Sequence, residues 1–361
     1  MKKFISIFSF ILMFILAVGC DSREKLYVLS WGEYINPDVV EAFEEEFGVR
    51  VVITEATSNE SMHNRIQTGA GQYDIVIPSD YMMERMVEDD LLLELDFDLL
   101  PNYSKEKFDP HLQELREEYF EGNEKYGVPY FWGTLGIMYN DAKPGVKELV
   151  ETNSWAVFFE PEIIPEGVTV GMYDSSRDAV AAALLYLDRD LNTKADKDYE
   201  DAEAALKKVK YTQWGTDDLK ESVAAKNLDI ALVYSGDFFD SLYFAIDNDL
   251  EVTFDMFVDQ EKNNVWFDVM VIPKTATKVE LAHAFINFFL DEDNALENAS
   301  YIGYCPPITS VYEAMLEDEE IAELVTHPGY YPGGVEGTVY RHLGVNIAQK
   351  MDSILSRVKI G

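Results

Sequence analysis

The sequence predicts an α/β fold of two lobes, each a mostly parallel sheet flanked by helices, with a hinge between the lobes. In both halves of the chain, short apolar strands alternate with helices, which is typical of sheets with crossover connections. The 361 residues are 47% apolar, and the roughly 340 that follow an N-terminal signal are enough for two domains. No low-complexity linker separates the halves, so we expect more than one strand to cross between them.

The first half of the chain is expected to begin with a strand, a helix and a second strand. Pro37 suits the start of the helix. Apolar residues such as Val39 and Phe43 then recur on one helical face, until Gly48 ends the helix. The other elements expected here are strands at residues 26–29, 49–53 and 74–78 and a helix at residues 62–68.

The same alternation returns later in the chain. The elements expected there are strands at residues 168–172, 229–234 and 265–272 and helices at residues 177–187 and 279–290. We expect the N-terminal lobe to comprise residues 26–135 and 266–313, and the C-terminal lobe to comprise residues 136–265 and 314–361.

The first residues have the pattern of a bacterial lipoprotein signal. Lys2 and Lys3 precede an apolar run that ends at Gly19, directly before Cys20. An ordinary signal peptide and an uncleaved anchor are the alternatives. No later stretch is long and apolar enough to cross a bilayer. We expect a signal peptide at residues 1–19, lipid on Cys20, a tether at 20–25, and a periplasmic or extracytoplasmic protein anchored by that lipid.

The net charge of −38 limits the partners of the chain. So acidic a protein is not expected to bind nucleic acid or anionic membrane surfaces, whereas a cationic ligand is permitted. Cys305 is the only other cysteine, so lipid on Cys20 would leave no intramolecular disulfide. The fold must then be stabilised by its core, and we expect a monomer that contacts the membrane only through its lipid.

Nothing in the sequence indicates catalysis. The five histidines are scattered, and the chain has no nucleophile elbow, phosphate-binding glycine loop or dinucleotide fingerprint. Cys305 shows no sign of activation, so a buried inert thiol is the simpler interpretation. We therefore expect a binding protein without a cofactor or metal rather than an enzyme.

Aromatic residues are repeatedly paired with carboxylates near the expected strand ends, where open α/β sheets bind ligands. Taken singly, each tryptophan is typical of a core and each aspartate of a helix cap. Together they suit a linear diammonium ligand, because carboxylates compensate the buried ammonium ends and aromatic faces cover the methylene stem. The groups are Trp31 and Tyr34 with Glu33, Tyr234 with Asp237, Trp266 with Asp268, and Tyr173 ahead of Asp178.

Six short motifs, in order along the chain, give a more specific signal. They are SWGEY at residues 30–34, TSNE at 57–60, YDIVIPS at 73–79, VPYFWG at 128–133, WFD at 266–268 and IGY at 302–304. With these motifs the sequence resembles the polyamine-binding proteins of bacterial ABC importers, the spermidine/putrescine receptor family, from residue 26 to about residue 348. The resemblance implies a hinged, two-lobed periplasmic-binding-protein fold of type II that closes on its ligand, and an ABC transporter permease as partner.

The resemblance also implies the site. The box-forming aromatics fall on Trp31, Tyr34, Tyr81, Tyr234, Trp266 and Tyr304. The ammonium-binding carboxylates fall on Asp178 and Asp268, with Glu33 near one end, and neutral hydrogen-bonding positions fall on Ser79 and Thr216.

Several positions that differ within the family bear on the ligand, and at one of them the common Trp is replaced by Tyr234. The acid that spermidine-type members place three residues before Asp178 is Ser175 here. Putrescine-type members place an acid three residues after the aromatic that matches Tyr234, and here that acid is Asp237. An amide-bearing position late in the chain falls on Tyr340. The resemblance therefore implies putrescine as the favoured ligand, with spermidine also accepted.

Two other interpretations remain open at this stage. Tyr330 and Tyr331 are similar to the adjacent tyrosines with which ferric-ion receptors of this fold class bind iron. Pro332 follows them with two glycines, which favours a turn with packed rings. A surface lipoprotein that serves as an interaction module or sensor is the other alternative, since fold does not fix function.

Overall fold

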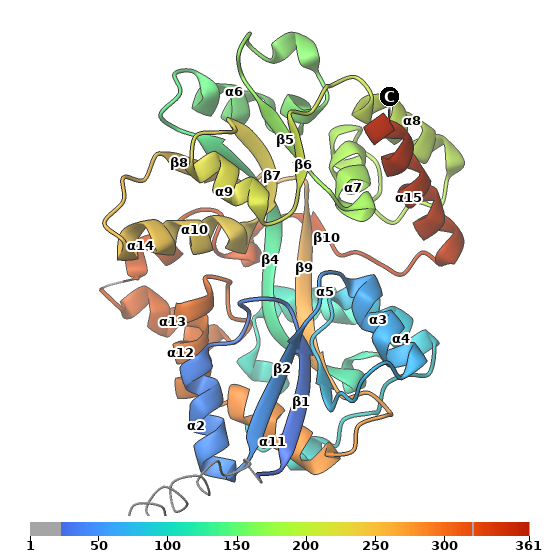
Figure 1. Ribbon diagram of the computed structural model, residues 1–361, viewed down its shortest axis with the longest axis vertical. Coiled ribbons are helices and arrows are strands. Elements are labelled where there is room, and N and C mark those ends of the chain that lie inside the picture. Colours follow the sequence, from blue (N-terminus) through green and yellow to red (C-terminus); the bar gives the residue numbers. More distant parts are fainter. Residues whose placement is uncertain (1–22, 320, 361) are drawn as a thin grey trace, which may run out of the picture.

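The computed structural model describes residues 23–319 and 321–360 as a mixed α/β molecule. The expected signal peptide at 1–19 and the lipid position Cys20 lie outside the described residues. Ten strands form one sheet in the order β2-β1-β3-β9-β4-β7-β5-β6, with β10 on β9 and β8 on β4. Helices cover this sheet in two groups, one around each end of β4 and β9 (Figure 1).

The first group confirms the alternation that the sequence predicts. Pro37 opens the helix, capped by the Asn36 side chain, and Gly48 ends it with a left-handed φ of 66°. Strand β1 pairs in parallel with β2 and β3. The bounds are β1 Lys25–Ser30, α2 Pro37–Phe47, β2 Arg50–Glu55, α3 Asn59–Thr68, β3 Ile75–Val76, α4 Asp80–Glu88 and α5 Pro110–Phe120.

The second group contains the elements expected between residues 168 and 234. Strand β5 pairs in parallel with β6 and β7, while β7 and β8 run antiparallel to β4. The bounds are α6 Val146–Asn153, β5 Val170–Tyr173, α7 Ser176–Tyr186, α8 Asp196–Leu206, β6 Gln213–Gly215, α9 Asp218–Ala224, β7 Ile230–Tyr234, α10 Ser235–Asp247 and β8 Phe254–Phe257.

Two long strands run through both groups. Strand β4, Gly127–Asn140, is buried along its whole length. It pairs with β9, Asn263–Val271, as far as Thr134, and from Leu135 onward it pairs with β7. The predicted lobe boundary between residues 135 and 136 lies beside this change of partner, and we keep that boundary as a proposal.

Strand β4 was not among the elements predicted from the sequence. Pro129, where the register with β9 shifts, and three glycines hide its pattern, and a strand buried on both faces has no polar alternation. The glycines permit close packing, since a Cβ on Gly133 would lie 2.6 Å from Cζ2 of Trp266. This packing depends on the pairing of β4 with β9, which places Gly133 opposite Trp266.

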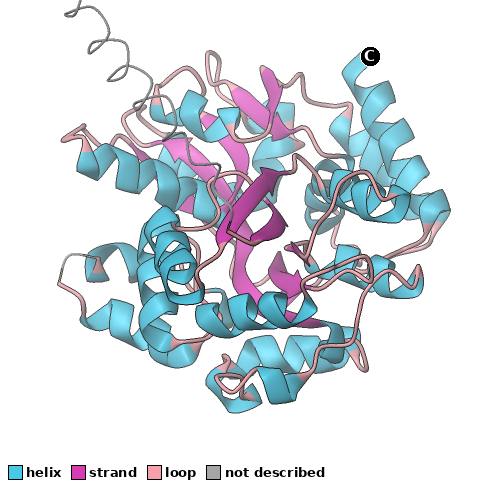
Figure 2. Ribbon diagram, turned by 60° about the horizontal axis from the view of Figure 1, so that its bottom comes forward, coloured by secondary structure: helices cyan, strands magenta, loops and turns pink. Residues whose placement is uncertain are grey.

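The C-terminal third of the chain contributes elements to both groups. Helix α11 confirms the predicted helix, and α15 packs against α7. Figure 2 shows the helices on either side of the sheet. Within the described ranges, no helix is both long enough and apolar enough to span a membrane. The remaining bounds are α11 Val279–Phe289, α12 Glu292–Ile302, α13 Thr309–Glu317, α14 Ala322–Val325, β10 Gly337–Thr338 and α15 Val345–Ile360.

Truncation of a β4 side chain tests its role as the central strand. Ile137 is fully buried and pairs with Leu232 of β7 and Phe257 of β8. Ile137→Ala should lower the free energy of unfolding by about 2–5 kcal/mol in urea titrations, because it leaves a cavity in the core. Ile53 on β2 is 39% exposed, so Ile53→Ala should change it by less than about 1 kcal/mol. Equal losses for both variants would contradict this assignment.

Candidate functional site

Most of the predicted ligand residues meet where the two groups of elements face each other. Hydrogen bonds, ring contacts and a backbone bridge connect them. We call this set the aromatic–acid cluster: Trp31, Tyr34, Ser79, Tyr81, Asp178, Tyr234, Asp237, Trp266, Asp268, Tyr304 and Tyr340.

Asp268 on β9 is the acid with the fewest partners in the cluster. It is 5% exposed, and its Oδ2 accepts a hydrogen bond of 2.8 Å from the Tyr34 hydroxyl. Its Oδ1 is buried and has no hydrogen-bond partner among the described residues, and the same holds for the Trp31 indole nitrogen. Ser79 lies opposite Asp268 in an isolated antiparallel bridge. The Trp31 indole is one of the contacts that lower the Asp268 pKa, so it lies near this carboxylate without forming a hydrogen bond of normal geometry. Oδ1 is therefore left for a better-placed donor.

Burial also changes the acidity of Asp268. It raises the pKa of this carboxyl to about 6, although polar contacts from Ser79, Tyr34 and Trp31 act in the opposite direction. No cation is among the causes of the shift. An ammonium group placed beside Oδ1 would favour the charged form and lower this pKa.

A series of edge-to-face rings connects this acid to the other group of elements. Tyr34 lies 5.5 Å from Tyr304 between ring centroids, and Tyr304 lies 5.3 Å from Trp266. Trp266 in turn lies 5.6 Å from Tyr234, at the end of β7. Such pairs hold their rings in fixed orientations. The rings therefore form an apolar wall with an acid at each end.

Asp178 lies at the other end of these rings, in the first turn of α7. It is 4% exposed, and its Oδ1 accepts hydrogen bonds from Tyr234 at 2.9 Å and from Tyr340 at 3.2 Å. Burial raises its pKa, which the hydrogen bonds and nearby Arg177 partly offset. Ser175, at the position where spermidine-type relatives were expected to carry an acid, caps α7 by accepting from the Asp178 amide.

Asp237 has more internal partners than the other two acids. Its Oδ2 accepts from the Tyr234 amide at 3.1 Å, and its Oδ1 lies 3.4 Å from the Tyr304 hydroxyl. Burial raises its pKa to about 6, while Lys220, 3.8 Å away, lowers it. Lys220 is closer to Asp240, at 2.7 Å. Asp237 therefore shares its internal cation with a second acid.

Arg177 is a charged neighbour that the sequence analysis missed. Its guanidinium lies 4.1 Å from the ring centroid of Tyr81 on α4 and 5.1 Å from that of Tyr340, at cation–π distance. The contact joins α7 to α4, which are far apart in the chain. The sequence carried no signal for it beyond the place of Arg177 directly before Asp178.

Two predicted residues are not connected to the cluster by any contact that the structure gives. Glu33 is exposed and adopts a left-handed φ of 50°. Thr216 is exposed as well, and its amide donates to Asp218 at 2.7 Å. The resemblance placed both residues by sequence position, and in this conformation both face solvent.

The adjacent tyrosines considered for iron are engaged within the protein. The Tyr330 hydroxyl donates to the Tyr304 carbonyl at 3.2 Å, and the Tyr331 hydroxyl donates to Asp109. The Tyr331 ring stacks on Tyr312 at 4.7 Å with an interplanar angle of 9°. The described part of the chain contains no group of three or more His, Cys, Asp or Glu side chains arranged for a metal ion.

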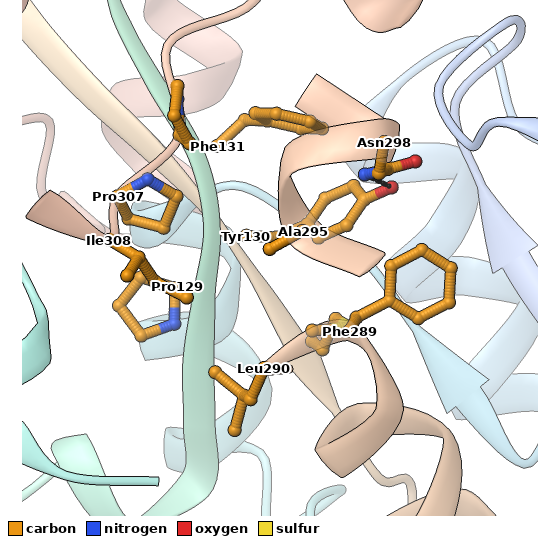
Figure 3. Close-up of a pocket in the computed structure, with 11 residues that line it drawn as sticks. Pro129, Tyr130, Phe131, Phe289, Leu290, Ala295, Asn298, Pro307 and Ile308 are labelled. Carbon is orange, nitrogen blue, oxygen red and sulfur yellow. Dashed lines mark hydrogen bonds between the residues drawn. The ribbon is translucent and has the colours of Figure 1, made fainter. Parts of the chain in front are cut away.

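A small cavity of about 20 Å³ has no residue of the aromatic–acid cluster in its lining (Figure 3). Tyr130 and Asn298 line it, and Asn298 donates to the Tyr130 hydroxyl at 3.0 Å. The Tyr130 hydroxyl donates in turn to the Tyr34 carbonyl at 2.7 Å. The cavity has room for about one water molecule, which is too little for a polyamine. Its lining residue Tyr130 supports Tyr34 through the hydrogen bond to the Tyr34 carbonyl.

The chain is similar to extracytoplasmic receptors of known families. A model of the family "Bacterial extracellular solute-binding protein" matches residues 38–328. The putrescine-binding periplasmic protein SpuD of Pseudomonas aeruginosa is 30% identical over 323 residues, 88% of this chain and 86% of that protein. The spermidine/putrescine-binding periplasmic protein of Escherichia coli is 29% identical, over 81% of this chain and 80% of its own length.

Solved structures give the same result for the fold. A putative spermidine/putrescine ABC transporter structure from Listeria monocytogenes matches with a TM-score of 0.76 and 31% identity, over 93% of this chain and 99% of that chain. A lipoprotein from Treponema pallidum matches with a TM-score of 0.74 and 25% identity, over 94% and 100%. These similarities confirm the predicted two-lobed periplasmic-binding-protein fold.

Removal of the Tyr34 hydroxyl tests the electrostatics at Asp268. Tyr34→Phe should raise the pKa of Asp268 above its value of about 6, because it deletes a hydrogen bond that favours the carboxylate. The pKa is measured from the pH titration of carboxyl carbon signals by NMR in the ligand-free protein. Tyr139→Phe removes a matching bond to Asp255 and should leave Asp268 unchanged. An unchanged pKa in Tyr34→Phe would contradict the assigned contact.

Proposed function

The chain belongs to the bacterial extracellular solute-binding proteins, and we propose that its solute is a short polyamine bound between the two lobes for an ABC importer. One observation carries the choice of ligand. A buried carboxylate, Asp268, has no cation near it and keeps an oxygen without a hydrogen bond of normal geometry among the described residues, beside a wall of aromatic rings. A solute-binding component is not an enzyme, and the relatives named above are periplasmic binding proteins.

The two ends of the cluster suit the two ends of a diamine. Asp268 would receive one ammonium group, with Ser79 and Tyr34 beside it. Asp178 would receive the other, with Tyr234 and Tyr340 holding its carboxylate. A dication needs such acids because its buried charges must be paired and hydrogen-bonded. The rings from Tyr34 to Tyr234 supply the apolar faces that the methylene stem requires.

Putrescine is the proposed favoured ligand, with spermidine also accepted. Ser175 provides no negative charge for the third ammonium group of spermidine, since its hydroxyl caps α7. Asp237 adds a buried acid beside Tyr304. Lys220 lies closer to Asp240 than to Asp237, so it neutralises Asp237 only in part. Glu33 and Thr216 stay in the proposal as residues that could approach the ligand when the lobes move.

We also propose that the protein is a lipoprotein held at the membrane by Cys20 and docks on an ABC transporter permease. The signal-like residues before Cys20 support the anchor. One structural relative, from Treponema pallidum, is itself a lipoprotein. The anchored lobes would hold the solute close to the permease that receives it.

Alanine substitution of the acids tests the site. Asp268→Ala and Asp178→Ala should each weaken putrescine binding at least about tenfold in titration calorimetry, because an ammonium group left buried without its carboxylate costs about 2–5 kcal/mol. Glu45 is an exposed acid on α2, and Glu45→Ala should bind like the wild type. Similar affinities for all three variants would show that the site is misassigned.

Ligand preference is tested by titrating the wild-type protein with each amine separately. We expect putrescine to bind at least as tightly as spermidine, because the additional ammonium group of spermidine meets Ser175 instead of an acid. Replacing that serine, as in Ser175→Asp, should then shift the preference towards spermidine. A strong spermidine preference of the wild type would refute the proposed ligand order.

A further inference from the structure

Asp80 is a fully buried acid that neither the sequence analysis nor the proposed ligand contacts include. It is 0% exposed and begins α4. Its Oδ1 accepts from the Tyr81 amide and its Oδ2 accepts from the Phe267 amide at 3.2 Å. The side chain therefore reaches from the start of α4 across to strand β9.

The position of Asp80 in the chain makes this bridge relevant to the ligand site. Asp80 lies between Ser79 and Tyr81, and the amide that it binds, that of Phe267, lies between Trp266 and Asp268. All four flanking residues belong to the aromatic–acid cluster. A second link runs alongside, where Ser79 bridges to Asp268. Asp80 thus sets the spacing between two ligand-binding segments that are far apart in sequence.

The charge of Asp80 acts on the same place. The charged neighbours that face it are Asp268 on β9 and Arg177 on α7, and Glu60 of α3 lies 3.4 Å from the hydroxyl of the adjacent Tyr81. Burial raises the pKa of Asp80 well above its usual range, the two amide bonds and Arg177 act against this, and Asp268 adds to it. A cation bound at Asp268 would favour the ionised form of both acids.

We propose that Asp80 is a positioning residue of the polyamine site, which holds the two ligand-binding segments together and adds a second buried negative charge behind the ammonium position at Asp268. The proposal rests on the proposed function. It makes amine affinity depend on the ionisation of an acid that does not touch the ligand. Binding of the dication then releases a proton from the site.

The variant Asp80→Asn removes the charge and keeps one of the two bonds to backbone amides, because an amide has the same shape but only one acceptor oxygen and cannot ionise. Putrescine affinity is measured by titration calorimetry from about pH 5.5 to about pH 8.5 for the variant and the wild type. The lost charge matters only where the wild-type acid is ionised. The ratio of the two dissociation constants should therefore rise at least about fivefold over this range, whereas loss of the bridge alone gives a ratio that is independent of pH.

Asp74 offers a matched control. It is also 0% exposed, and it bridges Tyr27 of β1 to Thr277 and Lys278 through backbone amides at 2.8–3.1 Å. None of its partners belongs to the aromatic–acid cluster. Asp74→Asn should lower stability while its ratio of dissociation constants to the wild type stays constant with pH.

The outcomes separate this inference from the proposed function. A wild type that binds putrescine, with a flat ratio for Asp80→Asn, overturns the role of Asp80 alone. A wild type that binds no amine at any pH overturns both. If Asp80→Asn does not fold, calorimetry of the wild type at about pH 7.5 in two buffers of different ionisation enthalpy decides. Proton release that persists in Asp178→Asn supports the proposal, since Asp268 is already mostly ionised at that pH and burial raises the pKa of Asp178 as well. No release, or release that is lost in Asp178→Asn, overturns it.

Discussion

Burial of acidic side chains among aromatic rings is the constraint on which the site depends. Asp268, Asp178 and Asp237 lie where water cannot solvate them, and burial raises the pKa of each. Because the pKa of Asp268 rises from about 3.9 in the unfolded chain to about 6, its stabilising contribution is complete below about pH 3.9 and is lost as pH rises through about 6. At neutral pH the site therefore favours any ligand that brings a positive charge to these acids.

The long crossing strands make this arrangement possible. Strand β9 carries Trp266 and Asp268, while β7, which brings Tyr234, is held by the far half of β4. Contacts from α4 also reach the other group of elements: Tyr81 packs under Arg177, and Glu84 receives the Arg341 guanidinium at 2.9 Å. A site built from both groups can respond to their separation, which is the property that a receptor closing on its solute needs.

Much of the fold could be predicted from the chain, because local signals were strong where elements are regular. Pro37 and Gly48 marked the two ends of one helix. In the first half of the chain, strands and helices alternate as predicted. Strand β4 was missed, because glycines and Pro129 obscure a strand that is buried on both faces. Arg177 and Asp80 were missed for another reason. Arg177 contacts Tyr81 and Asp80 accepts from the Phe267 amide, and no local sequence pattern connects either pair.

The sequence by itself determined the order of the elements, the acidic charge, the scarcity of cysteine and the residue types near the strand ends, since these follow from composition and short-range periodicity. Only the tertiary structure decided which acids are buried and which already have a cation nearby. Asp268 and Glu33 are the same kind of group in sequence, yet one is 5% exposed and the other faces solvent. The physical reason is that solvation and pairing depend on neighbours brought together by long-range strand pairing, which the chain encodes only as a whole.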